Sequence, residues 1–345
     1  MGRYRFLLAL CVVLSHCGLN IAGINPGVVA VISFYILSGF VMTGLVRRHY
    51  ATPDRIQAFY VDRIARLFPQ FWCYCALTTL LWAGGWIKPD WLAEVSAKGL
   101  LLNFLMMPLG LYMPDFLALN GTMLMPQGWS LGLELMFYAV LPFLLQRTSF
   151  AVRCTIAGLS FLIFAAAILG LLHTSHFGYK LLPGTLFIFI VGIALAERTR
   201  ASVGFVCVVI AAALCLFASG PTIWNDDYGF MLGRAVLLGI VIGIPAVALL
   251  RDIPSTTVDE VAGDMSYGVF LNHYIFIWLI ETQWGIEIFS VQLMAGVVLC
   301  SIALSAVTYA LVEKPALAWR RSIRYRTNVT PDAAILRWIP APRMG

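Results

Sequence analysis

The chain opens with MGRYRFLLALCVVLSHCG, residues 1–18, in which a basic start leads into an apolar run that carries His16. A secretory signal peptide also begins this way, but no A-x-A-like cleavage site follows, and the histidine interrupts the apolar core. We therefore interpret residues 4–22 as a retained transmembrane helix. A titratable ring in hydrocarbon is costly and usually serves a function, so this helix is a candidate carrier of the active site.

The composition of the 345-residue chain is that of a polytopic membrane protein. Hydrophobic residues make up 61% of the chain and charged residues 12%, against roughly 25% charged residues in soluble domains. The net charge of +6 does not indicate a nucleic-acid partner, because the basic residues gather in loops and near the ends. The eight cysteines show no zinc-binding spacing, so no metal site is expected.

The apolar runs predict an all-α integral membrane protein, a bundle of about ten transmembrane helices. The predicted spans are residues 4–22, 27–46, 64–85, 128–145, 151–172, 180–196, 202–219, 230–250, 265–284 and 289–312. Residues 99–119 are also apolar, but two prolines and Asp115 interrupt them. We expect an interfacial or re-entrant segment there rather than a span.

The distribution of basic residues predicts the orientation of the bundle. With ten spans, the arginine-rich loops and the C-terminal segment all fall on one side. The only lysines or arginines in the opposite loops are Lys88 and Lys98. The basic side of a membrane protein is cytoplasmic, so both termini are expected inside. We expect a single membrane domain over residues 1–345, with a short basic cytoplasmic tail from about residue 313 and no fused soluble domain.

Arg5 and His16 share one face of the first predicted helix. Eleven helical steps of ~100° come within about 20° of a whole number of turns, so the two side chains point in the same direction. The two residues are ~16 Å apart along the helix axis. Arg5 would then lie at the cytoplasmic rim and His16 somewhat outward of the middle of the membrane. The alternative is a snorkelling arginine together with a histidine that only bonds a neighbouring helix.

Arg63 and Arg66 lie at positions i and i+3 at the cytoplasmic entry of the third predicted span. Two guanidinium groups on one helix face can bind phosphate in bidentate fashion. Simple anchoring at the cytoplasmic surface explains the same pair, and Asp62 could neutralise part of its charge.

Glu134 is a buried-carboxylate candidate at a depth similar to that of His16. It lies about six residues inside a span that enters from the outer side, ~9 Å deep, and His16 would lie ~12 Å from that surface. A hydrogen bond between the two would offset the cost of burying the carboxylate. The alternative is a purely structural bond. His273, ~12 Å from the cytoplasmic side, is either a second polar residue of a cavity or a core histidine.

Six motifs, in order, resemble those of the acyltransferase-3 family of membrane acyltransferases. They are R-x10-H (Arg5, His16), FYILSGFVMT at 34–43, R-x-x-R followed by LFP at 63–69, WSLGLELMFYAVLP at 129–142, SYGVFLNHY at 266–274 and VEKPAL at 312–317. They cover nearly the whole chain. The Asp-Gly pair that often precedes the first arginine in the family is replaced here by Arg3 and Tyr4.

The resemblance implies an acyl-CoA-dependent O-acyltransferase in the bacterial cytoplasmic (inner) membrane. The implied donor is acyl-CoA, with acetyl as the default acyl group, and no tightly bound cofactor. The implied acceptor is a hydroxyl of a carbohydrate or glycoside, and membrane lipid surrounds the chain. The implied residues are His16 as general base oriented by Glu134, Arg5, Arg63 and Arg66 on the CoA phosphates, and Trp129, Ser130, Tyr267, Asn272 and His273 as further pocket candidates.

An acyl-histidine intermediate is a less favoured variant of this mechanism. A proton-coupled transporter of a small solute or lipid-linked sugar, with His16 and Glu134 as a relay, is the alternative function. Transporters often contain internal repeats, which this sequence lacks, and the arginine pair would then have no role. The sequence does not specify the acceptor, the acyl chain or the oligomeric state.

Overall fold

The computed structural model describes residues 1–113, 117–220, 231–285 and 289–325, with side chains to residue 319. Over these residues the fold is all-helical and has no strand. The helices are α1 (Gly2–His16), α2 (Pro26–His49), α3 (Ile56–Ala83), α4 (Ala97–Phe104), α5 (Gly128–Gln146), α6 (Phe150–Ile168), α7 (Leu182–Glu197), α8 (Arg200–Ala218), α9 (Leu232–Leu250), α10 (Thr257–Trp284), α11 (Val291–Thr308) and α12 (Lys314–Tyr325). The all-helical prediction is confirmed.

Polar residues in the loops cap the apolar helices. Asn25 accepts hydrogen bonds from the backbone of Gly27 and Val28 at the start of α2, and Pro26 occupies the first helical position. Ser149 and Thr256 cap α6 and α10 in the same way. Capped helices satisfy their own backbone groups, which an apolar surrounding requires.

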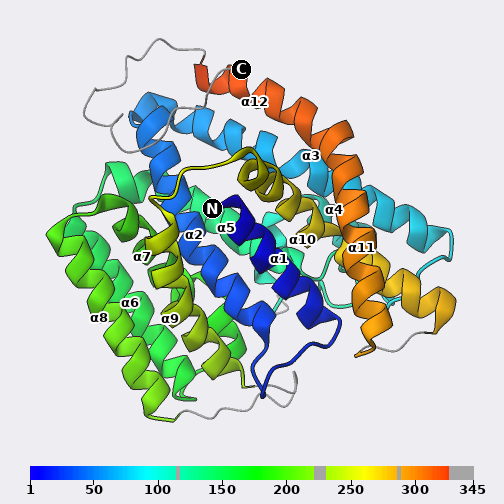
Figure 1. Cartoon of the computed structure of the whole chain (residues 1–345), viewed down its shortest axis with the longest axis horizontal. Helices are drawn as coiled ribbons and strands as arrows, with labels where there is room; N and C mark the ends of the chain where they lie inside the picture. The colour runs from blue at the N-terminus through cyan, green and yellow to red at the C-terminus, as the bar shows by residue number, and fades with distance from the viewer. Residues whose placement is uncertain (114–116, 221–230, 286–288, 326–345) are drawn as a thin grey trace.

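The helices form two groups that meet at α1, α2 and α5. Helices α6, α7, α8 and α9 lie on one side, and α3, α10, α11 and α12 lie on the other (Figure 1). Helix α2 packs against α7 and α9, and α1 packs against α2 and α10. At the α2–α7 crossing, a Cβ atom on Gly39 would lie 2.1 Å from the carbonyl oxygen of Phe189. The two backbones are therefore in direct contact, as in other membrane helix pairs with small residues.

Ten of these helices fall at the ten predicted spans. Seven segments are long and apolar enough to cross a membrane by length and composition: Pro26–His49, Gly128–Gln146, Phe150–Ile168, His176–Glu197, Arg200–Ala218, Leu232–Leu250 and Val291–Trp319. Helices α1, α3 and α10 do not meet these criteria. Helix α1, with 15 residues, is ~22 Å long, shorter than the ~30 Å hydrocarbon core. The predicted outer loops at 220–229 and 285–288 lie almost entirely outside the described residues.

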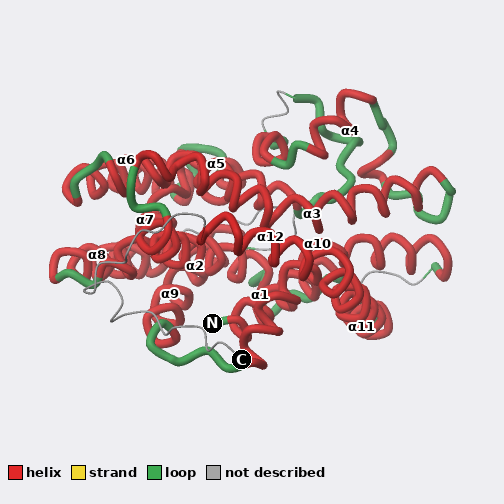
Figure 2. The backbone as a smooth tube through the Cα atoms, turned by 90° about the horizontal axis from the view of Figure 1, so that it is seen from above, coloured by secondary structure: helices red, strands yellow, loops and turns green. Residues whose placement is uncertain are grey.

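The apolar stretch 99–119 does not form a span, as predicted. It contains the end of the eight-residue α4 and a 3₁₀ helix, Met107–Leu111; Asp115 lies outside the described residues. Figure 2 shows α4 and its loops at one edge of the bundle, beside α3. The 3₁₀ helix lies on the first turns of α5, where a Cβ on Gly132 would meet the Gly110 nitrogen at 2.3 Å. Helix α5 therefore starts beneath a covering segment.

The predicted cytoplasmic tail begins as a helix. The five-residue π-helical turn Tyr309–Glu313 joins α11 to α12, which packs against α3. Residues 326–345 of the predicted tail lie outside the described part of the chain.

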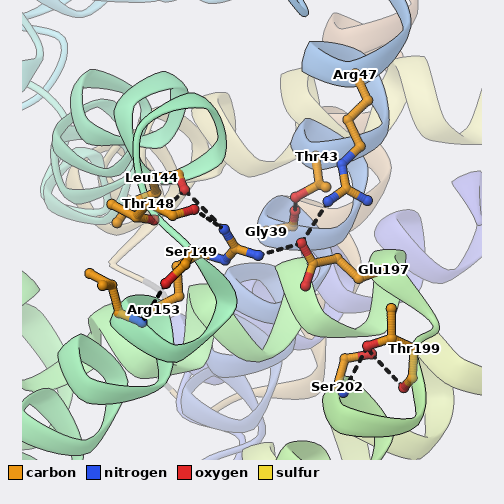
Figure 3. A network of polar contacts seen from close by, with 11 residues as sticks. Gly39, Thr43, Arg47, Leu144, Thr148, Ser149, Arg153, Glu197, Thr199 and Ser202 are labelled. Carbon is orange, nitrogen blue, oxygen red and sulfur yellow. Dashed lines mark hydrogen bonds and ion pairs between the residues drawn. The ribbon is translucent and has the colours of Figure 1, made fainter.

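Glu197 at the end of α7 joins three helices through ion pairs. Its Oε1 accepts from Arg47 of α2 at 2.6 Å and from Arg153 of α6 at 2.7 Å (Figure 3). The Glu197 side chain is 7% exposed and Arg153 is 9% exposed, whereas Arg47 is 43% exposed. Arg153 also donates to the carbonyl oxygens of Leu144 and Thr148, which ties α6 to the end of α5.

Glu197→Ala is expected to lower the free energy of unfolding by about 3–5 kcal/mol, because it leaves the Arg153 guanidinium buried and without its carboxylate. Arg47→Ala is the matched control and should cost about 0–1 kcal/mol, since Arg47 is substantially exposed. Denaturant unfolding of the protein in mixed micelles measures both. Equal losses of unfolding free energy in the two variants would contradict the expectation that the buried Arg153–Glu197 pair matters more than the exposed Arg47.

Candidate active site

Two neighbouring cavities lie between α1, α2, α5 and α10. The arginine cavity, about 150 Å³, is lined by Arg5, Arg63, Arg66 and Glu134 among others. The histidine cavity, about 390 Å³, is lined by His16 and by several aromatic side chains. Both cavities share three lining residues: Val31, Ser130 and Phe270. The structure therefore brings all three predicted donor arginines to one cavity and His16 to the adjacent one.

The three arginines differ in their partners. Arg63 donates from Nε to the Asp62 carboxylate at 3.0 Å, and both side chains are buried. Arg66 forms an ion pair with Glu313. The Arg5 guanidinium has no hydrogen bond to any described residue, although it lies in the same cavity. Arg5 is thus the guanidinium whose donors are available to an anion without displacing a carboxylate.

Glu134 belongs to the arginine cavity. Its Oε1 accepts hydrogen bonds from the hydroxyls of Ser38 and Tyr138, both at 2.5 Å. The predicted bond from Glu134 to His16 is absent, and that expectation is wrong. The turn Met107–Leu111 packs on the first turns of α5, and the helix places the Glu134 side chain between α2 and the arginines. Glu134, in the second turn of this helix, therefore lines the same cavity as the three arginines.

His16 bonds His273 instead. His16 Nδ1 and His273 Nε2 are 2.8 Å apart, the ring centroids are 5.0 Å apart and the ring planes differ by 8°. This is an in-plane hydrogen bond that joins α1 to α10. His273 Nδ1 lies 2.8 Å from the carbonyl oxygen of Phe270, one turn earlier in its own helix. His16 Nε2 has no hydrogen bond to a described residue, and the ring lines the histidine cavity.

The remaining predicted pocket residues divide between the two cavities, with two exceptions. Trp129 lines the histidine cavity and packs edge-to-face on Tyr179 at 4.9 Å. Ser130 lines both cavities, and Tyr267 lines the arginine cavity with the Arg66 guanidinium 5.4 Å from its ring centroid. Asn272 lines neither cavity. The expectation that His273 lines a pocket is also corrected, because it is fully buried and lines neither cavity.

The Asn272 amide faces α3 and α11 rather than α1. Its Nδ2 donates to Tyr74 of α3 and to the carbonyl oxygen of Ser301 of α11. Asn272 and His273 are successive helical residues, about 100° apart around the axis, so only one of them can face α1. The expectation that Asn272 lines the pocket is therefore corrected.

The prediction missed Lys180 as a residue of the histidine cavity. Lys180 is 5% exposed, and its Nζ lies 2.6 Å from the Tyr112 hydroxyl and 5.4 Å from the Trp129 ring centroid. It ends the π-helical turn His176–Lys180 before α7. A lysine at the start of an apolar span is itself a sequence signal of function. No three side chains among the described residues converge as metal ligands.

Asp259 fixes α1, the helix that carries Arg5 and His16. Its carboxylate accepts from the Met1 ammonium at 2.8 Å and from the backbone N–H groups of Gly2 and Arg3 at 2.9 and 3.0 Å. Burial raises the pKa of Asp259, but these hydrogen bonds outweigh it and hold the pKa below the usual aspartate value. A Cβ on Gly2 would lie 1.6 Å from the Asp259 carbonyl oxygen, so only glycine permits this approach.

The comparisons with known proteins agree with the residue pattern. The Acyl_transf_3 profile, described as an acyltransferase domain, matches residues 4–312. The chain is 32% identical over 161 residues to an uncharacterized protein of Aquifex aeolicus (strain VF5). The matched region covers 45% of this chain and 72% of that protein. No solved structure matches the chain.

Asp259→Asn is expected to lower the free energy of unfolding at pH 7 by roughly 1.5–3 kcal/mol, because the charged acceptor is lost. The native pKa of Asp259 is depressed, so its contribution is complete above the unfolded-state value of ~3.9 and is lost as pH falls through the native value. The difference between wild type and variant should therefore shrink on acidification.

Asp252→Asn is the control, and thermal unfolding in detergent at several pH values is the measurement. A hydrogen bond from Arg198 lowers the pKa of Asp252 too, but its side chain is 60% exposed, so the cost should be small. A difference for Asp259→Asn that grows toward low pH would contradict the role of the carboxylate.

Proposed function

Because the chain belongs to the Acyl_transf_3 family of acyltransferase domains, we propose that it transfers an acyl group, acetyl by default, from cytoplasmic acyl-CoA to a hydroxyl of a carbohydrate or glycoside. The observation that carries the proposal is the contact between the two cavities. Three guanidinium groups line one cavity and His16 lines the other, and Val31, Ser130 and Phe270 line both. A donor and an acceptor held in the two cavities would meet at these shared residues.

The arginine cavity suits the anionic part of CoA. Guanidinium groups bind phosphates in bidentate fashion, and a site walled by apolar helices strengthens such bonds. Arg5 offers donors that no described carboxylate engages, and the ion pairs of Arg63 and Arg66 hold their guanidinium planes in place. Glu134 faces these cations, so its charge acts on the donor side of the site rather than on His16.

The histidine cavity suits a sugar ring. Its volume of about 390 Å³ is within the usual range for small-ligand sites, and Trp91, Trp129, Tyr179 and Tyr274 contribute aromatic surface. Asn25 and Lys180 add polar groups to the same wall. Aromatic faces with a few polar groups match a molecule that has both apolar C–H faces and hydroxyls.

His16 is the proposed general base. Its Nε2 takes the proton of the acceptor hydroxyl while the hydroxyl oxygen attacks the thioester carbonyl carbon. The C–S bond then breaks, and the CoA thiolate takes the proton back from the imidazolium, so the products are an ester and CoA thiol. Attack on the thioester by Nε2 itself, through an acyl-histidine, is the less favoured route.

We further propose that α1–α3 and α5–α11 cross the bacterial inner membrane as ten spans with both termini in the cytoplasm. The basic loops support this orientation, since they all lie on one side in a ten-span chain. The arginine cavity would then open toward cytoplasmic CoA and the histidine cavity toward an acceptor on the outer side.

His16→Ala is expected to reduce acyl transfer to background, because no other group in the histidine cavity can accept the hydroxyl proton as well as imidazole. The measurement is thiol release from acetyl-CoA by the purified protein, with octyl glucoside as a glycoside probe and water as the reference acceptor. His173→Ala, in an exposed loop, is the control and should leave turnover unchanged. Near-normal turnover by His16→Ala would exclude His16 as the base.

Arg5→Gln is expected to weaken acetyl-CoA binding, because each lost charge-assisted hydrogen bond costs about 1.5–3 kcal/mol, or roughly ten- to a hundredfold in Kd. It is a cleaner test than Arg63→Gln or Arg66→Gln, which leave Asp62 or Glu313 without its cation. Calorimetry gives the Kd, and Arg200→Gln, exposed and outside the cavity, is the control. An unchanged Kd would place CoA elsewhere.

A further inference from the structure

His273 is a buried polar residue that the mechanism above does not use. It is 0% exposed, lines neither cavity and uses both ring nitrogens in hydrogen bonds. One bond goes to the carbonyl oxygen of Phe270 and the other to His16. A core histidine that only filled space would not need to bond the one histidine that faces the reaction cavity.

The partners of His273 determine where its proton lies. A carbonyl oxygen can only accept, so His273 Nδ1 carries the hydrogen that bonds Phe270. In a neutral ring the other nitrogen, Nε2, then has a lone pair and can only accept. The 2.8 Å bond to His16 therefore requires His16 Nδ1 to be the donor. It follows that the proton of neutral His16 is on Nδ1 and the lone pair is on Nε2, toward the histidine cavity.

The Phe270 carbonyl is itself held in place. Gln127, which is 2% exposed, donates from Nε2 to the carbonyl oxygens of Leu271 at 2.6 Å and Phe270 at 3.3 Å. Both carbonyls belong to the middle of α10, so a rigid backbone and a buried amide fix the acceptor at the end of the chain of hydrogen bonds.

We infer that His273 is the positioning residue of the site: through the Phe270 carbonyl it fixes His16 as the Nδ1–H tautomer and aims Nε2 at the acceptor hydroxyl. The catalytic meaning of this inference rests on the proposed function. His273 thus takes the place that the sequence assigned to Glu134. A neutral imidazole replaces a carboxylate, which avoids burying an unpaired charge next to the apolar part of α10.

The relay also accommodates the charged state of the reaction. When Nε2 takes the hydroxyl proton, His16 becomes an imidazolium whose Nδ1–H still donates to His273, and a bond from a charged donor is stronger than a neutral one. The imidazolium then returns the Nε2 proton to the CoA thiolate as the C–S bond breaks. His273 Nδ1 keeps its own proton on Phe270 throughout, so no net proton crosses the pair.

Nitrogen-15 NMR of the full-length protein, labelled at histidine imidazoles, tests the tautomer directly. The wild type should show two neutral rings with a protonated Nδ1 and an unprotonated Nε2, those of His16 and His273, and the His16 signals should disappear in His16→Ala. His273→Leu removes the acceptor, so the His16 pattern should change, and turnover should fall at least about tenfold with the KM for acetyl-CoA unchanged.

His273→Gln is the conservative rescue, because its Oε1 can accept the His16 Nδ1–H bond. It should keep the His16 pattern and recover turnover relative to His273→Leu. Asn272→Leu is the control for general damage to α10: it can lower stability but should leave the His16 signals in place, since Asn272 faces α3 and α11.

An Nε2–H tautomer of His16 in the wild type, or an unchanged His16 pattern in His273→Leu, would overturn the inference. Failure of the proposed function is separate. If the wild type does not turn over acetyl-CoA, that function is wrong, whereas the NMR result still decides whether His273 sets the tautomer.

Discussion

The hydrogen bond between His16 and His273 follows from a constraint on the whole bundle: a polar side chain between apolar helices is costly unless it is hydrogen-bonded, and several of these bonds join different helices. The same constraint produces Glu134 with Ser38 across α5 and α2, and Arg66 with Glu313 across α3 and the π-helical turn. Each bond joins segments far apart in sequence. The polar residues of this chain therefore determine how the helices are placed, and the apolar residues fill the space between them.

The two cavities follow from this placement. Asp259 and the close approach of Gly2 and Gly263 hold the start of α1 against α10. The face of α1 that carries Arg5 and His16 therefore borders the space between α2, α5 and α10. The turn Met107–Leu111 covers the start of α5, and Trp91 and Gln127, from the loops before α5, add to the wall of the histidine cavity. Helix α1 therefore places Arg5 in the arginine cavity and His16 in the histidine cavity.

The sequence predicted the helices, the unusual segment at 99–119 and the gathering of Arg5, Arg63 and Arg66, because periodicity, prolines and motif order are local signals. It did not predict the partner of His16. Depth along a helix axis was the only coordinate that the sequence supplied for Glu134, and depth does not say which neighbouring helix the side chain faces; it bonds Ser38 of α2 and lines the arginine cavity. The sequence also could not predict which of Asn272 and His273 faces α1, because this depends on how α10 is rotated about its own axis. Lys180 does carry a local signal in the sequence, because it is a lysine at the start of an apolar span.

The central claim is that donor and acceptor meet where the two cavities adjoin, with His16 Nε2 within hydrogen-bond reach of the attacking hydroxyl. The most direct measurement is a cryo-EM structure of the full chain in nanodiscs with a non-hydrolysable thioether analogue of acetyl-CoA. The account predicts phosphate density against Arg5 and the acyl carbonyl beside His16, near Val31, Ser130 and Phe270. An analogue whose nucleotide occupies the histidine cavity, or whose acyl end lies away from His16, would contradict it.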